Sequence, residues 1–110
     1  MIVFMGSGVV EVYLKKPSAA SNSIVKSSYS LAMTDGSDSG IGRAYFDGSG
    51  NGTYVIDIGP TASGSFTYSI DTGGIVTATE SGNVLSGITN SDGTLGVMVE
   101  MGLFQFFIHR

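Results

Sequence analysis

Apolar runs recur along this chain about every ten residues, separated by clusters of Gly, Asp, Asn and Ser. Within the runs apolar and polar side chains alternate with a period of two, as in a strand with one buried face. Apolar residues at helical spacing are absent between Lys16 and the C-terminus. The pattern therefore predicts an all-β antiparallel fold. We expect ten strands, over residues 2–5, 9–16, 27–34, 41–47, 53–59, 64–71, 74–80, 83–89, 94–101 and 103–109.

Three of these strands alternate clearly enough to assign their inner faces. Small hydroxyl residues separate the apolar positions of 65–70. The strands expected at 27–34 and 53–59 show a similar alternation. Strands of this kind cover a core with one face and meet water with the other. We expect the following side chains to point inward: Tyr29, Leu31, Met33, Tyr54, Ile56, Ile58, Phe66, Tyr68 and Ile70.

The connections between strands are short and contain pairs such as Asn51-Gly52 and Asp92-Gly93, which suit tight hairpins. Such connections join neighbouring antiparallel strands, so the chain should form an up-and-down meander. Eight strands within 27–110 can close into a barrel, and a two-sheet sandwich is the alternative. The 110 residues should form a single domain, with an N-terminal hairpin at 1–16, a linker at 17–26 and an eight-stranded unit at 27–110.

The N-terminal hairpin resembles the C-terminal one. With Ser7-Gly8 treated as an insertion, residues 9–16 match 103–110 conservatively at eight successive positions. A closed eight-stranded unit has room for only one such strand, and an unpaired apolar strand promotes association. We therefore expect a homodimer or larger oligomer, or a contact with another protein. The expected interface residues are Val10, Val12, Leu14, Phe104, Phe106 and Ile108.

The composition limits the possible partners and chemistry. The net charge is −4, and residues 29–102 carry eight acids but only one base, Arg43. Such a surface repels phosphate backbones, so nucleic-acid binding is not expected. The absence of cysteine excludes disulfides and Cys-based metal sites. The apolar N-terminal patch is interrupted by glycines and Glu11, so we expect no membrane span there and no leader within this chain.

No candidate site meets the requirements of a known chemistry, so we predict no catalytic residue, metal or cofactor. Asp47, Ser49 and Asn51 match the start of a calcium loop, but Ile58 stands where the bidentate Glu is needed. The loop containing Asp35 and Asp38 has the composition of a solvated turn. His109, next to the C-terminus, is expected to be an outward basic position, and Gly40-Ile-Gly42 lacks the strand–helix context of a phosphate loop.

The segments AYFDGSGN at 44–51, GSFTYSI at 64–70 and LSGITNSDGTL at 85–95 resemble a pattern of bacterial secreted or surface β-rich repeat proteins. The resemblance covers about residues 29–110 and implies an extracytoplasmic module; it transfers no catalytic residue.

From these observations we expect a non-enzymatic structural or interaction module. The bulky inward residues favour a filled core. The alternative is a lipocalin-like barrel that binds a small apolar ligand with Tyr29, Tyr54, Phe66 and Tyr68 as its lining.

Overall fold

The computed structural model describes residues 2–6, 9–34, 38–60, 62–100 and 103–110. Each of the ten predicted strands is present within these ranges, and one 3₁₀ helix precedes the third strand. The elements are β1 (Ile2–Gly6), β2 (Val9–Tyr13), η1 (Asn22–Ile24), β3 (Ser27–Thr34), β4 (Ser39–Phe46), β5 (Asn51–Ile58), β6 (Ala62–Ile70), β7 (Ile75–Glu80), β8 (Asn83–Thr89), β9 (Leu95–Glu100) and β10 (Leu103–His109).

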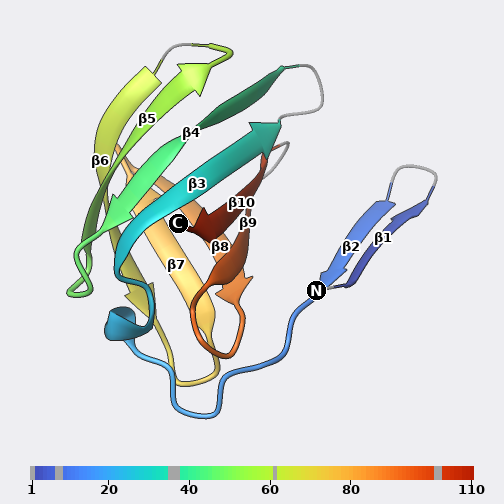
Figure 1. Cartoon of the computed structure of the whole chain (residues 1–110), viewed down its shortest axis with the longest axis vertical. Helices are drawn as coiled ribbons and strands as arrows, with labels where there is room; N and C mark the ends of the chain where they lie inside the picture. Colours follow the sequence, from blue (N-terminus) through green and yellow to red (C-terminus); the bar gives the residue numbers. More distant parts are fainter. Residues whose placement is uncertain (1, 7–8, 35–37, 61, 101–102) are drawn as a thin grey trace.

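Strands β3 to β10 form a closed antiparallel barrel in which every strand pairs with its sequence neighbours (Figure 1). Pairing of β10 with β3, from Phe104 opposite Thr34 to His109 opposite Tyr29, closes the ring. The predicted all-β meander is therefore confirmed, and closure distinguishes the fold from the sandwich alternative. A closed barrel has no free sheet edge, so a further strand cannot join it by backbone pairing.

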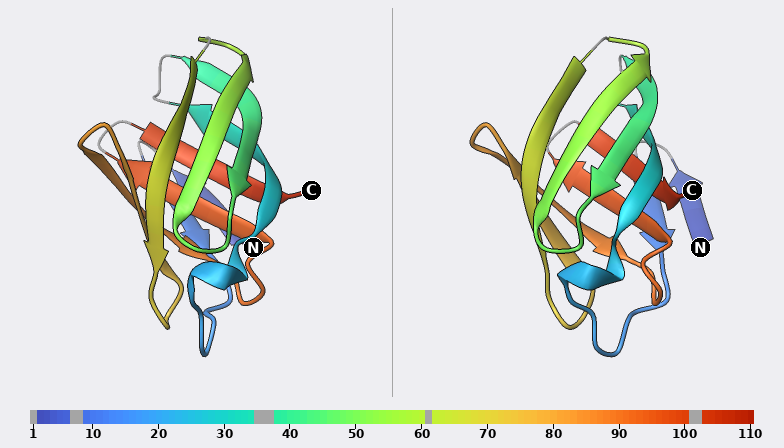
Figure 2. Two further views of the ribbon diagram at one scale, coloured as in Figure 1. Left: turned by 90° about the vertical axis from the view of Figure 1, so that its left-hand side faces the viewer. Right: turned by 60° about the vertical axis from the view of Figure 1, so that its left-hand side comes forward.

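The barrel has two different ends, seen from the side in Figure 2. The closed end carries η1 and the loops at 47–50, 71–74 and 90–94, whereas β3, β5, β7 and β9 each run to the open end and finish there. Segment 17–26, expected to be a linker, packs against the closed end. Ala20 and Val25 belong to the core cluster, and the Asn22 side-chain oxygen accepts a 2.8 Å hydrogen bond from the Ile70 N–H. The segment therefore caps one end of the barrel.

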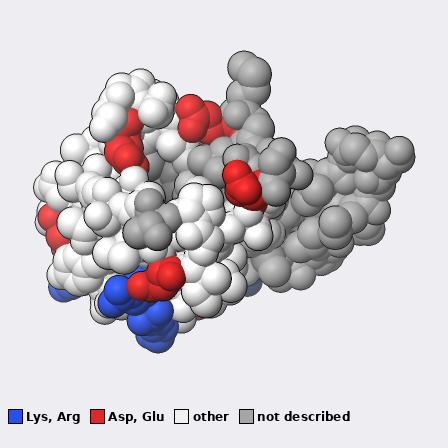
Figure 3. Space-filling view, turned by 90° about the horizontal axis from the view of Figure 1, so that it is seen from above, with Lys and Arg blue, Asp and Glu red and all other residues white. Residues whose placement is uncertain are grey.

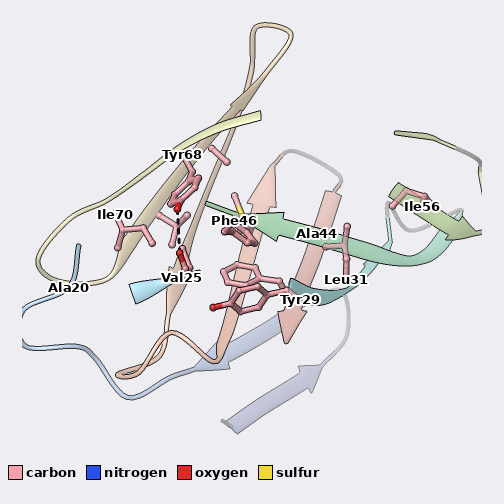
Figure 4. Close-up of a cluster of buried hydrophobic side chains, with 13 residues drawn as sticks. Ala20, Val25, Tyr29, Leu31, Ala44, Phe46, Ile56, Tyr68 and Ile70 are labelled. Atoms are coloured by element: carbon pink, nitrogen blue, oxygen red, sulfur yellow. Dashed lines mark hydrogen bonds between the residues drawn. The ribbon is translucent and has the colours of Figure 1, made fainter. Parts of the chain in front are cut away.

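An aromatic cluster fills the closed end, as Figure 4 shows in part. The rings of Tyr29, Phe46 and Phe107 lie 5.1–5.5 Å apart, and the Tyr68 ring lies 5.1 Å from that of Phe46. The Tyr29 hydroxyl donates a 2.6 Å hydrogen bond to the Gly93 carbonyl. Burial raises the pKa values of Tyr29 and Tyr68. We call this cluster of Tyr29, Phe46, Tyr68 and Phe107 the aromatic plug.

The predicted inward register is correct at most positions, but Ile58 is an exception. Ile41 pairs with Ile58 while Gly42 pairs with Ile56, so Asp57 is an extra residue in β5. This β-bulge reverses the alternation, and Ile58 points outward with 66% of its surface exposed. The Asp57 carboxylate instead forms a two-point ion pair with Arg43, at 2.9 and 3.0 Å, on the outer wall.

The N-terminal hairpin forms a separate two-stranded sheet beside the part of the barrel that contains β9 and β10 (Figure 1). Its register matches that of the C-terminal hairpin, since Gly6 pairs with Val9 as Glu100 pairs with Leu103. Residues 9–13 thus occupy positions equivalent to residues 103–107. The two hairpins differ in their context, because β10 is part of the barrel and β2 pairs only with β1.

Candidate ligand-binding lumen

On two strands the inward side chains are small at the open end and large at the closed end. On β4 and β6, glycine and alanine stand at the open end and aromatic residues at the closed end. Small side chains leave the upper lumen unfilled, while the aromatic residues close it below. The inward series are Gly40, Gly42, Ala44 and Phe46 on β4, and Ala62, Gly64, Phe66, Tyr68 and Ile70 on β6.

Above the plug lies a cavity of about 460 Å³. Phe46 and Phe107 border it on the plug side, and its side walls are largely apolar. Small-molecule sites in proteins typically measure roughly 300–1,000 Å³ and combine apolar walls with a few polar groups. The lumen has that size and character. The apolar wall residues are Leu31, Met33, Ala44, Ile56, Ala62, Phe66, Ala78, Leu85 and Met98.

The polar groups gather near the open end. Glu80 and Glu100 are the last residues of β7 and β9, and each follows an inward residue by two positions. Both therefore point into the mouth of the cavity, which Asp38 also borders. Figure 3 looks onto the open end and shows acidic side chains around it, with basic ones toward the side. Among the described lining residues, carboxylates are the only charged groups.

Tyr54 links the apolar wall to this acidic mouth. Its hydroxyl donates a 2.7 Å hydrogen bond to Glu80 Oε1. Burial, followed by the hydrogen bond and charge of Glu80, raises the pKa of Tyr54 to about 12. The phenol thus remains protonated at neutral pH and holds the Glu80 carboxylate in place at the mouth.

The structure separates the four residues predicted to line a ligand site. Tyr54 and Phe66 line the cavity, whereas Tyr29 and Tyr68 belong to the plug beneath it and their hydroxyls donate to backbone carbonyls. The core is filled by side chains at the closed end, as expected, but not toward the open end. Sequence reasoning missed Glu80 and Glu100. Two signals could have found them: the decreasing side-chain size toward one end of β4 and β6, and the inward glutamates that end β7 and β9.

The other candidate residues have local structural roles. The Asp47 carboxylate accepts hydrogen bonds from the N–H groups of Ser49 and Asn51, at 2.7 and 3.0 Å, which lower its pKa. The His109 ring packs edge-on against Tyr29, with centroids 5.1 Å apart. Gly40 and Gly42 lie within β4. In the described ranges no three His, Asp or Glu residues form a group that could hold a metal. The Asp35–Asp38 pair lies partly outside those ranges.

The predicted interface residues of β10 face outward. Phe107 is the inward residue, so Phe104 and Phe106 lie on the outer wall, where their rings contact at 4.9 Å. Ile108 is 51% exposed, and Val99, which pairs with Phe104, is 47% exposed. Val12 and Leu14 are half-buried, while the side chain of Val10 lies outside the described residues. The outer wall around β9 and β10 is therefore rich in apolar side chains.

Comparison with known proteins yields no family model, curated protein or solved structure that matches this chain. No helix in the described part of the chain is long and apolar enough to cross a bilayer. The functional argument therefore depends on the geometry of the barrel.

Proposed function

We propose that this barrel binds a small, largely apolar molecule in its lumen. The observation that carries the proposal is the 460 Å³ cavity, which has apolar walls and a plugged floor. An unfilled apolar space of this size forfeits packing contacts that a core would otherwise make. A ligand would restore them. The role is binding, and no residue is assigned a catalytic function.

The test is a fluorescence titration with N-phenyl-1-naphthylamine, a neutral apolar dye that brightens when it leaves water. We expect saturable binding with a Kd on the order of micromolar. The variant Ala78→Leu should abolish it, because Ala78 is a buried wall residue and the larger side chain would occupy the lumen.

The matched control is Ala32→Leu, the same substitution at an exposed position of β3. It should leave the dye affinity unchanged. Thermal unfolding of both variants would verify that they fold. Saturable binding of equal strength in wild type and a folded Ala78→Leu variant would place the dye elsewhere and refute lumen binding.

A second proposal retains the extracytoplasmic interaction module expected from the sequence. It is favoured by the exposed apolar residues of the outer wall, among them Val99 and Ile108, and by the N-terminal hairpin beside that wall (Figure 1). Isolated two-stranded hairpins are marginally stable in water, so this one would gain stability from a partner surface. Light scattering should then detect an oligomer that changes its assembly state when residues 1–16 are deleted. A monomer before and after deletion would refute self-association.

A further inference from the structure

We infer that the ligand of this lumen is an amphiphile with an apolar body and one cationic group, such as a primary ammonium, held at the mouth by Glu80 and Glu100. The inference rests on the proposed function and specifies the chemistry of the molecule that the lumen accepts.

The first argument is the charge distribution over the whole barrel. Four of the described basic groups can be placed away from the mouth. Lys26 packs near Gly48 and Lys16 near Gly73, both at closed-end loops. Arg43 is paired with Asp57 on the outer wall, and Arg110 donates to Ser30 on the outer face of β3. The carboxylates at the mouth therefore produce a negative potential that no described lining base offsets, and low-dielectric walls concentrate such a field.

The second argument is the alignment of charge with the apolar surface. Strand β7 presents Ala78 and then Glu80 to the lumen, and β9 presents Met98 and then Glu100. Both strands run toward the open end, so each carboxylate lies above an apolar wall. A cation seated between them places the attached apolar body in the cavity. A carboxylate-headed ligand in the same position would be repelled.

The third argument is that the site is preorganised. Tyr54 fixes Glu80 through its 2.7 Å hydrogen bond, which occupies one of roughly four acceptor positions of a carboxylate. The remaining acceptor capacity suits the three N–H donors of an ammonium group. Because the carboxylate is already oriented, binding needs less ordering of the protein.

The cavity volume sets the size of the ligand. At the packing density of protein interiors, about 0.74, a 460 Å³ space holds roughly 340 Å³ of molecule. That volume corresponds to on the order of twenty non-hydrogen atoms at most. An unbranched ten-carbon chain with a polar head fits within this limit, and it allows the head group to be changed without changing the body.

The experiment is displacement of N-phenyl-1-naphthylamine from the full-length protein at pH 7 by decylamine, decanol and decanoate. Decanol is used below its solubility limit, and the two charged compounds below their micelle concentrations. The three compounds share a chain and differ in head charge. We expect decylamine to bind about tenfold or more tightly than decanol, and decanoate to bind most weakly. The advantage of decylamine over decanol should shrink between 20 mM and 500 mM salt.

The variant that tests the assignment is Glu80→Gln combined with Glu100→Gln. It should bring decylamine to within about threefold of decanol. Asp57→Asn, which removes a carboxylate from the outer wall, is the matched charge control and should preserve the amine preference. If the double variant does not fold, each single variant should lose part of the preference.

The outcomes separate the two proposals. Equal binding of decylamine and decanol by the wild type, or a preference that persists in the folded double variant, would refute the cationic ligand and leave the lumen as a general apolar site. Failure of the dye and all three compounds to bind would refute lumen binding itself.

Discussion

Replacement of Phe107 by alanine is the most direct test of the aromatic plug. Phe107 is 1% exposed, and its ring lies 5.5 Å from that of Tyr29 and 5.4 Å from that of Phe46. It also covers the backbone of Gly96, its partner on β9, where an added Cβ would collide with the ring. The substitution would thus remove contacts from two aromatic rings and from a neighbouring strand.

The expected loss of unfolding free energy is about 3–5 kcal/mol, the range for large buried aromatic side chains replaced by alanine. Small domains are stable by only about 5–15 kcal/mol, so the barrel would lose a large share of its stability. Urea unfolding monitored by circular dichroism should show a much lower midpoint with an unchanged slope, since the surface exposed on unfolding is nearly the same.

The matched control is Phe106→Ala on the same strand. Phe106 points to the outer wall and is half-buried, so its loss should cost about 1 kcal/mol, less than the 1.5–3 kcal/mol of full burial. Equal losses of unfolding free energy in the two variants would refute the argument. They would mean that Phe107 does not face the core while Phe106 faces the outer wall.

Three further predictions concern other parts of the barrel. Gly96→Ala should lower the melting temperature, because its methyl group would overlap the Phe107 ring and overpacking costs about 1–3 kcal/mol. The pKa of Tyr54, about 12, should fall in Glu80→Gln, as followed by ¹³Cζ NMR. In the wild type, the free energy of unfolding should decline as pH rises from about 10 toward 12, because folding favours the neutral phenol. Asp47 has a lowered pKa, so its contribution to the stability of the fold is present above about pH 4 and is lost on acidification. Asp47→Asn should therefore make the urea midpoint less dependent on acid pH.

The fold could be predicted because its signals are local. A strand such as β6 reveals its buried face through alternation over a few residues, and Phe66, Tyr68 and Ile70 stand on one face as expected. Hairpin turns likewise depend on adjacent residues such as Asn51-Gly52. Once alternation and short turns were identified, an up-and-down meander followed. The number of strands allowed a closed barrel but left the sandwich as an alternative, and only the pairing of β10 with β3 distinguishes the two.

The lumen could not be predicted from individual strands, because it depends on which residues of different strands lie at the same height. Tyr54 and Tyr68 alternate in the same way along their strands, yet only Tyr54 lines the cavity. Ile58 continues a regular alternation in the sequence, and only the pairing of β4 with β5 reveals the bulge that turns it outward. Segment 17–26 has a linker-like composition, but it buries Val25 beneath the barrel.

The aromatic plug and the proposed binding site lie at different heights along the barrel axis. The plug gathers the buried aromatic residues at one end, where they hold β3, β4, β6 and β10 together through ring contacts. Near the mouth, Gly40, Gly42 and Gly64 offer little side-chain packing. The open end must therefore be held chiefly by its backbone pairing, and a ligand that fills it would add the missing contacts. Because such a ligand binds only the folded protein, it would stabilise the barrel by RT ln(1 + [L]/Kd), about 2.7 kcal/mol at 100 times Kd. The plug can keep the chain folded while the mouth is empty, so the proposed selection of ligands by the carboxylates of Glu80 and Glu100 need not be compromised by the demands of folding.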